Sequence, residues 1–269
     1  MDAEFDIDKA RTTIKRFISE KLLASGMRGY VVGLSGGIDS AVSTALAVEA
    51  VGAGKVLAVL MPDRSSPKES VSDALELVRR LGIDHRLVDI TPMISAYFPS
   101  ITRQNRLRAG NKMARERMSI LFDIAHELDR LVLGAGNRTE ICLGYTTWYG
   151  DGACSINPVG ELYKTEIRRL AGRLGIPDAI REKTPSADLW NGQTDEGEIG
   201  VNYEQIDRLL RRVVDDGAIS LSALVADGFS AADIDRVVSL VNRNAFKRRM
   251  PDVAAVGRKA IPDKILLEQ

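Results

Sequence analysis

The 269-residue sequence has only two cysteines, Cys142 and Cys154, and only two histidines, His85 and His126. Two cysteines cannot form the disulfide framework that a small secreted domain needs. Two histidines weaken the case for a zinc site or a Ser/His/Asp triad. Catalysis by this chain would therefore depend on carboxylates, lysine, arginine and backbone groups, with or without a metal ion.

The sequence also lacks net charge and long apolar runs. Its 37 Lys and Arg residues balance 37 Asp and Glu residues, which removes any bulk electrostatic basis for nucleic-acid binding. No apolar run approaches the ~18–20 residues of a membrane span. Residues 1–8 are acidic where a signal peptide would be basic. We therefore expect a cytoplasmic protein that binds neither nucleic acid nor a membrane.

Apolar runs alternate with amphipathic segments over the first half of the chain. They predict strands over residues 30–34, 55–61, 85–90 and 130–134, and helices over 39–53, 68–81 and 104–128. This alternation is typical of an α/β fold, here a Rossmann-like doubly wound parallel sheet with helices on both faces. Beyond residue 160 the pattern predicts a helical C-terminal part. The segments 63–70 and 184–200 are expected to be mobile lids.

A glycine-containing loop, Ser35-Gly36-Gly37-Ile38-Asp39-Ser40, joins the first strand to a helix. Adjacent glycines and the free N–H groups of a helix N-terminus suit a phosphate. The loop has neither the lysine of a P-loop nor the glycine spacing of a dinucleotide fingerprint. Asp39 would repel phosphate unless a cation such as Mg²⁺ lies between them. The alternative is that Asp39 and Ser40 only cap the helix.

This S-G-G-x-D-S loop resembles the pyrophosphate loop of the ATP pyrophosphatase superfamily. Its members cleave ATP between the α and β phosphates and adenylate a carboxyl or carbonyl oxygen. A nitrogen or sulfur nucleophile then displaces AMP. In that chemistry the loop holds the leaving pyrophosphate, which explains the missing P-loop lysine.

The order and spacing of the later motifs resemble those of the NAD⁺ synthetase family, from about residue 10 to about residue 255. These motifs are Asn111–Met118, Leu133–Glu140, Tyr149–Gly152, Asn157–Val159, Tyr163–Ile167, Thr184–Leu189, Asp195–Tyr203 and Phe246–Pro251. The resemblance implies an adenine nucleotide alpha-hydrolase-like fold and a single synthetase domain over residues 1–269. It also implies a C–N ligase that amidates deamido-NAD⁺ with ammonia through an NAD-adenylate, the last step of NAD⁺ biosynthesis.

The resemblance implies three sets of ligand-binding residues, with Asp39, Asp151 and Lys164 as the catalytic groups. Asp151 would help to deprotonate ammonium. The Mg²⁺ ligands would be Asp39, Glu140 and Ser186. The ATP-binding residues would be Gly33, Leu34, Ser35, Gly36, Gly37, Ile38, Asp39, Ser40, Arg64, Ala135, Lys164 and Ser186. The residues that bind deamido-NAD⁺ would be Asn111, Arg115, Tyr145, Trp148, Asp151, Ser155, Glu198, Phe246 and Lys247.

Each of these residues, taken alone, also has an ordinary structural interpretation. Glu140 and Ser186 could cap helices, Asp151 could be a turn residue, and Lys164 could be a surface lysine. The remaining alternatives are a solvated charge at Arg115 and Lys247, a core position for Phe246, and packing for Trp148 and Tyr149. The chain departs from many relatives at Leu60, Ala135, Trp148, Ser155 and Phe246.

Only about 29 residues precede the first strand, too few for the glutaminase domain of glutamine-dependent relatives. We therefore expect free ammonia, or ammonia from a separate glutaminase, as the nitrogen source. The family forms homodimers, and the helix around 104–128 is the expected interface element, with core packing as its alternative role. Two other functions stay open: another ATP pyrophosphatase, such as an enzyme that catalyses a GMP-synthetase-like amidation, and a non-catalytic nucleotide-binding module.

Overall fold

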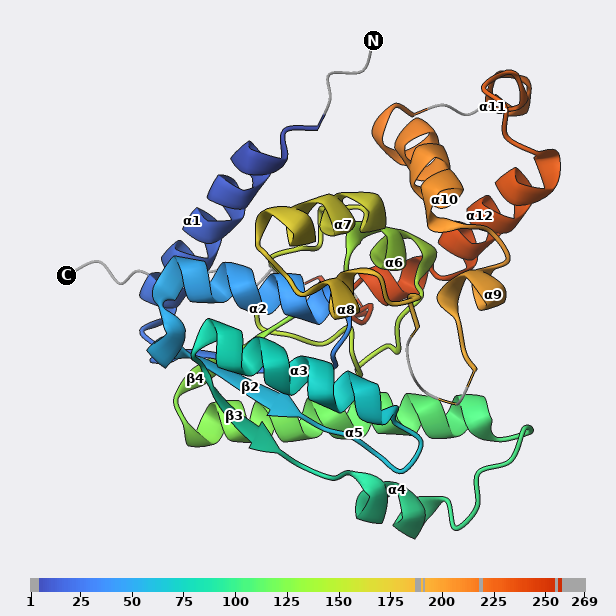
Figure 1. Ribbon diagram of the computed structural model, residues 1–269. Coiled ribbons are helices and arrows are strands. Elements are labelled where there is room, and N and C mark those ends of the chain that lie inside the picture. The colour runs from blue at the N-terminus through green and yellow to red at the C-terminus, as the bar shows by residue number, and fades with distance from the viewer. Residues whose placement is uncertain (1–4, 187–189, 191, 218–219, 255, 258–269) are drawn as a thin grey trace.

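A computed structural model describes residues 5–186, 190, 192–217, 220–254 and 256–257. Its sheet has four parallel strands in the order β3-β2-β1-β4 (Figure 1). The strands are β1 (Gly29–Gly33), β2 (Val56–Leu60), β3 (Asp84–Leu87) and β4 (Arg130–Leu133). All four were expected near these positions, and the predicted parallel sheet is confirmed.

Helices cover both faces of the sheet because its strands bury side chains in both directions. Tyr30 and Val32 of β1 join one apolar cluster with α1 (Ile7–Ser25), α2 (Ile38–Val51) and α3 (Lys68–Leu81). Val31, between them in sequence, joins a separate cluster with α4 (Thr91–Tyr97) and α5 (Arg106–Glu127). In Figure 1 these two layers lie above and below the strands.

The C-terminal part is helical, as predicted, and has its own apolar cluster around Tyr203, Ile206 and Leu210. None of the helices in the described part of the chain has the length and hydrophobicity that a membrane span requires. The helices that follow β4 are α6 (Arg138–Leu143), α7 (Lys164–Arg173), α8 (Asp178–Arg181), α9 (Asp195–Ile199), α10 (Tyr203–Leu210), α11 (Leu221–Ala226) and α12 (Ala231–Arg243), with a π-helix η2 (Arg211–Asp215) and a 3₁₀ turn η3 (Ala245–Arg248). A further 3₁₀ turn, η1 (Ala53–Lys55), lies between α2 and β2.

Two predictions about local structure need correction. The strand predicted over 85–90 ends at Leu87 and is an edge strand, paired only with β2, whose residues are mostly exposed. The segment 63–70 overlaps the start of α3, as the predicted helix bounds required, and its mobility stays a prediction. The segment 184–200 includes α9, and its residues 187–189 and 191 lie outside the described residues. Helices α1 and α4 were not predicted.

The fold brings three helix N-termini to the carboxyl end of the sheet: those of α2, α6 and α7. The loop between β1 and α2 turns at Gly36, whose φ of +80° is left-handed. A Cβ atom at Gly36 would overlap the backbone carbonyl of Ser70 in α3. Glycine is therefore required both for the turn and for the close approach of α3.

We expect Gly36→Ala to destabilise the protein by more than about 1 kcal/mol, because alanine disfavours this φ and would overlap α3. Gly172→Ala is the matched control, since Gly172 lies within α7 and a Cβ atom there meets nothing within 4 Å. That control should raise stability by about 0.4–1 kcal/mol. Denaturant unfolding measures both, and equal effects of the two substitutions would contradict this role for Gly36.

Candidate active site

The loop Ser35–Ser40 is held by its own hydroxyl groups. The Ser40 hydroxyl donates to the Gly37 carbonyl at 3.0 Å and lies 3.0 Å from the Ser35 hydroxyl. The Gly37 N–H donates to Ser35 Oγ at 3.2 Å. The N-cap of α2 is Gly37, and no side chain in the described structure caps this helix. The helix-cap interpretation of Asp39 and Ser40 is therefore wrong, and the first turn of α2 is available to a ligand.

Lys164, Asp39 and Glu140 form a charged cluster beside this loop. Lys164 is only 2 % exposed, so its interpretation as a surface lysine is wrong. Its Nζ atom lies 2.5 Å from Asp39 Oδ2 and 3.6 Å from Glu140 Oε1. Each residue lies in the first turn of a different helix, namely α7, α2 and α6. The helix N-termini therefore bring together residues that are far apart in sequence.

The two carboxylates keep the lysine charged. Burial alone would lower the pKa of Lys164, but the charges of Asp39 and Glu140 raise it above its usual range. Burial and the nearby charge of Asp39 raise the pKa of Glu140, while Lys164 opposes that rise. A buried charge is costly unless it is paired and hydrogen-bonded, and the two half-buried carboxylates provide that pairing for the buried ammonium ion.

Asn137 fixes the orientation of both carboxylates, a role that the motif alone did not reveal. Its side-chain amide donates to Asp39 Oδ1 at 2.9 Å. Its Oδ1 atom accepts the Glu140 N–H at 2.9 Å, and Glu140 Oε2 accepts the Asn137 N–H in return. Glu140 does cap α6, as one alternative held, but the same side chain also faces Lys164.

A third acidic residue, Asp195, approaches the cluster from α9. It is 4 % exposed, and Tyr203 donates to its Oδ2 atom at 2.9 Å. Its other oxygen, Oδ1, has no hydrogen-bond partner in the described structure. Burial raises the pKa of Asp195, although Lys164 opposes this. Sequence reasoning placed Asp195 in a motif but assigned it no role, because its position depends on the packing of α9.

The cluster fits a magnesium ion that shares its coordination with a bound phosphate. Asp39 and Glu140 already bind one cationic group between them, and carboxylate oxygens are preferred Mg²⁺ ligands. No group of three or more acidic, histidine or cysteine side chains among the described residues could hold a metal on its own. Magnesium commonly uses one or two carboxylates together with substrate phosphates.

Residues 144–151 form a second part of the site, built around Asp151. Its carboxylate accepts hydrogen bonds from Thr146 Oγ1 at 2.9 Å and from the Thr147 N–H at 2.8 Å. Asp151 is exposed as a residue, and desolvation of its hydrogen-bonded carboxyl group raises its pKa. Asp151 is thus a turn residue whose carboxylate is held in place.

Two side chains of α5 contact the same loop. Asn111 accepts a hydrogen bond from the Thr147 hydroxyl at 2.8 Å, and Arg115 donates to the Trp148 carbonyl at 3.3 Å.

Two aromatic rings of this loop, Trp148 and Tyr149, form a cluster with Phe246 of η3. Trp148 stacks on Tyr149 with 4.5 Å between ring centroids and meets Phe246 edge-on at 5.2 Å. Phe246 is half exposed, so its interpretation as a core residue is wrong. Tyr149 has a left-handed φ of 60°. Such a cluster offers an open apolar surface to a ring.

Lys247 anchors the loop from the C-terminal side. Its Nζ atom donates to the Gly144 carbonyl at 2.7 Å and to the Thr146 carbonyl at 2.8 Å. Asn244 and Arg248 donate to the neighbouring carbonyls of Leu143 and Cys142. These three side chains satisfy backbone acceptors at the C-terminal end of α6, where donors are needed. The interpretation of Lys247 as a solvated charge is therefore wrong.

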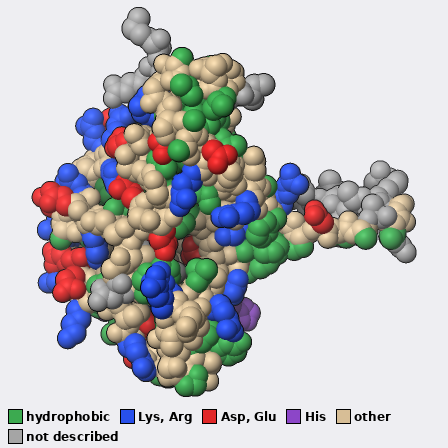
Figure 2. All heavy atoms as spheres, turned by 90° about the vertical axis from the view of Figure 1, so that its right-hand side faces the viewer, with side chains coloured by type: hydrophobic (Ala, Val, Ile, Leu, Met, Phe, Trp, Pro, Cys, Tyr) green, Lys and Arg blue, Asp and Glu red, His purple; other side chains and the backbone are tan. Residues whose placement is uncertain are grey.

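The remaining predicted site residues have contacts of their own. Tyr145 donates to Glu198 Oε2 at 2.6 Å, which joins the loop after α6 to α9. Arg64 donates to Ser95 of α4 at 2.8 Å, and the Ser155 hydroxyl accepts the Val132 N–H of β4 at 3.0 Å. Their predicted contacts with ligands remain predictions, as does the role of the half-buried Ser186. Figure 2 shows the face of the molecule toward which the strands of Figure 1 point. On this face Lys and Arg side chains surround a hollow, and acidic side chains lie inside it.

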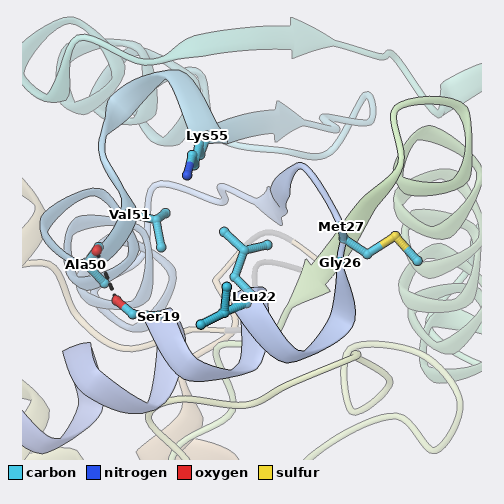
Figure 3. A pocket seen from close by; sticks show the side chains of 8 residues that line it. Ser19, Leu22, Gly26, Met27, Ala50, Val51 and Lys55 are labelled. Carbon is cyan, nitrogen blue, oxygen red and sulfur yellow. Dashed lines mark hydrogen bonds between the residues drawn. The ribbon is translucent and has the colours of Figure 1, made fainter.

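A pocket of about 480 Å³ lies at the other end of the sheet, between the C-terminal ends of α1 and α2 (Figure 3). Leu22, Met27 and Val51 line it, and Lys55 is its only lining residue with a charged side chain. Ser19 donates to the Ala50 carbonyl at 3.0 Å at its wall. This lining offers no acid–base pair, so the carboxyl end of the sheet is the candidate active site.

Comparison with known proteins agrees with this placement. The family described as NAD synthase matches residues 11–251. This chain belongs to the NAD synthase family. An NH₃-dependent NAD⁺ synthetase of Fusobacterium nucleatum is 43 % identical over 255 residues, which cover 95 % of this chain and 98 % of the relative.

Solved structures of NAD synthase relatives share the fold over nearly the whole chain. An NMN synthetase of Francisella tularensis has a TM-score of 0.82 and 35 % identity, covering 93 % of this chain and 99 % of that one. An NH₃-dependent NAD synthetase of Campylobacter jejuni has a TM-score of 0.78 and 32 % identity, covering 93 % and 100 %. The predicted family and fold class are thus confirmed.

Asp195 generates a prediction about stability and pH. Because burial raises its pKa in the folded protein, ionisation of Asp195 opposes folding. This cost is absent below the unfolded-state pKa of about 3.9 and grows as the pH rises toward the folded-state pKa. We expect Asp195→Asn to be more stable than the wild type near pH 7, and expect that advantage to disappear near pH 4.

The measurement is denaturant unfolding of metal-free protein between pH 4 and pH 8. Asp235→Asn, at an exposed position of α12, is the control and should change stability by less than about 0.5 kcal/mol at each pH. Parallel stability curves for Asp195→Asn and the wild type would refute the argument.

Proposed function

We propose that this chain is an ammonia-dependent NAD⁺ synthetase. ATP adenylates the nicotinate carboxylate of deamido-NAD⁺ and releases pyrophosphate. Ammonia then attacks the acyl-adenylate and releases AMP, forming the amide of NAD⁺. The observation that supports this proposal most strongly is the buried Lys164 ammonium ion, held by Asp39 and Glu140 beside the Ser35–Ser40 loop.

The first part of the site would bind ATP. The free N–H groups at the start of α2 and the Lys164 ammonium ion would bind its phosphates. Asp39 and Glu140 would hold Mg²⁺, which would stabilise the negative charge on the leaving pyrophosphate. These carboxylates would then have a second cation, and Lys164 could turn its charge toward a phosphate oxygen. Gly33, Ala135, Arg64 and Ser186 remain proposed ATP contacts.

The second part of the site would bind deamido-NAD⁺. Trp148, Tyr149 and Phe246 offer an aromatic surface to the nicotinate ring. Asn111 and Arg115 reach the same loop from α5. Ammonium must lose a proton before it attacks, and a carboxylate with a raised pKa, such as Asp151, is suited to accept it.

The direct test is an assay with ATP, Mg²⁺, ammonium and deamido-NAD⁺. We expect NAD⁺, AMP and pyrophosphate in equal amounts, with none formed when deamido-NAD⁺ is omitted. Asp39→Asn should lower kcat by about a hundredfold or more, because it weakens the proposed hold on the Mg²⁺ ion that stabilises charge on the phosphates. Asp235→Asn should keep wild-type rates. Full activity of Asp39→Asn would contradict the role of the cluster.

Substrate arms of this assay separate the alternatives. Because one similar structure is an NMN synthetase, nicotinate mononucleotide is tested beside deamido-NAD⁺; faster turnover of the mononucleotide would overturn the proposed substrate. Amidation of xanthosine monophosphate would favour a GMP-synthetase-like enzyme, and ATP binding without turnover would favour a nucleotide-binding module. Glutamine as the only nitrogen donor should support little turnover, and full-rate turnover would refute the ammonia source.

We also propose that the protein forms a homodimer through the layer of α4 and α5. Part of α5 packs on the sheet, as its alternative role held, with Met113 and Ile124 buried. The same layer nevertheless exposes large apolar side chains. These are Met93, Tyr97, Ile101, Leu107 and Phe122. Exposed apolar residues on adjacent elements support an interface with a second copy.

Light scattering should give the mass of a dimer, and Leu107→Arg should shift it toward a monomer because a charge would be buried in the interface. Leu23→Arg, on the exposed end of α1, is the control and should leave the dimer intact. An active enzyme that is a monomer at all assayed concentrations would refute the dimer.

A further inference from the structure

Asp207 of α10 is an ionisable residue that is fully buried and lies outside every motif role assigned above. Both of its carboxylate oxygens are used. Oδ1 accepts the Thr139 hydroxyl at 2.6 Å, and Oδ2 accepts the Thr165 N–H at 2.8 Å. One carboxylate therefore bridges the first turns of α6 and α7.

The two threonines are the sequence neighbours of the residues in the charged cluster. Thr139 precedes Glu140 in α6, and Thr165 follows Lys164 in α7. The Thr139 hydroxyl oxygen also accepts the Lys164 N–H at 3.0 Å. Asp207 and Thr139 together therefore tie the backbone of Lys164 to the turn that carries Glu140.

The electrostatics show why a carboxylate suits this position. Burial raises the pKa of Asp207, while the hydrogen bonds from Thr139 and Thr165 and the charge of Arg211 oppose the rise. The first N–H groups of α6 and α7 have no partner within their own helices and carry partial positive charge, and a carboxylate complements both. A buried charge that is satisfied in this way fixes one arrangement of its partners, because any displacement leaves a costly unpaired group.

A second set of contacts supports the same junction from outside. Arg211 donates to Glu166 of α7 at 2.8 Å and to the Thr165 hydroxyl at 3.3 Å. Asp215 pairs with Arg138 of α6 and accepts the Tyr163 hydroxyl at 2.8 Å. The outer contacts are partly exposed, whereas Asp207 is buried, so Asp207 is the bridge least accessible to competing water.

We propose that Asp207 is a positioning residue for ATP binding: it sets the separation of Glu140 and Lys164 by holding the first turns of α6 and α7 together. This inference rests on the function proposed above. It assigns Asp207 no contact with ATP or deamido-NAD⁺, and it predicts that loss of the bridge weakens the ATP side of the site while the loop around Asp151 keeps its affinity for deamido-NAD⁺.

The test compares Asp207→Asn with Leu209→Ala. Asparagine keeps the shape, but its single carbonyl oxygen can replace only one of the two carboxylate acceptors, so if it accepts the Thr165 N–H, the bond that the Thr139 hydroxyl donates is lost. Leu209 lies in the same helix and is buried in the apolar cluster of the C-terminal part, so Leu209→Ala destabilises α10 without removing a hydrogen bond to α6 or α7. Thr139→Val removes the bridge from the other side, and Thr139→Ser preserves it.

Each variant is characterised by its unfolding midpoint, by the KM values for ATP and deamido-NAD⁺, and by ATP affinity in calorimetry. We expect Asp207→Asn and Thr139→Val to raise the KM for ATP by about tenfold or more, consistent with loss of a buried hydrogen bond. The KM for deamido-NAD⁺ should change less than about twofold in both variants. Thr139→Ser, which keeps the hydroxyl, should bind ATP with the affinity of the wild type. Combining Asp207→Asn with Thr139→Val should add little, because both remove one bridge.

Three results would overturn the inference: an unchanged ATP affinity in both bridge variants, an equal loss in Leu209→Ala at a similar unfolding midpoint, or equal increases in both KM values. If Asp207→Asn does not fold, Thr139→Val and Thr139→Ser decide alone. Calorimetry separates this inference from the proposed function. Weak ATP binding by the bridge variants, with no NAD⁺ formed by the wild type, would support the bridge and refute the synthetase.

Discussion

The buried ammonium ion of Lys164 is the interaction on which the rest of this site depends. Asp39 and Glu140 meet at this edge of the sheet with the ammonium ion within 4 Å of both side chains. Removing one member of such a group leaves an uncompensated buried charge, which is far more costly than loss of a surface ion pair. The ion pairs therefore hold α2, α6 and α7 in a single arrangement before any ligand binds.

That arrangement accounts for the division of the site into two parts. The helix N-termini provide N–H groups and cations suited to phosphates. The loop 144–151 is anchored by Lys247 and faced by α5. Its aromatic rings suit the nicotinate ring, and the Asp151 carboxylate suits the ammonium ion that must lose a proton. Adenylation followed by amidation needs both parts at one place, and α6 joins them, since Glu140 lies in its first turn and the loop follows its C-terminal end.

Much of this architecture is predictable from local sequence patterns. Helix α3 was predicted at the bounds observed, because apolar residues recur on one face and Gly82 adopts the left-handed conformation that ends it. The site residues Asp39, Glu140 and Lys164 were predicted from the order of motifs, although no single motif explains why they meet. The predicted bounds of the exposed edge strand β3 were less accurate, because its short apolar pattern does not reveal that it pairs with only one strand.

The residues that were missed act through tertiary contacts. Asn137 reaches a carboxylate 98 positions away, and Asp207 reaches a hydroxyl 68 positions away. Their residue types are common in caps and on helix surfaces, so only the packing of α2, α6, α7 and α10 gives them a role. The role of Lys164 can be tested by a structure with a non-hydrolysable ATP analogue and Mg²⁺. The phosphates should lie at the Ser35–Ser40 loop within hydrogen-bond distance of Lys164. A nucleotide bound elsewhere, with Lys164 still between Asp39 and Glu140, would refute that role.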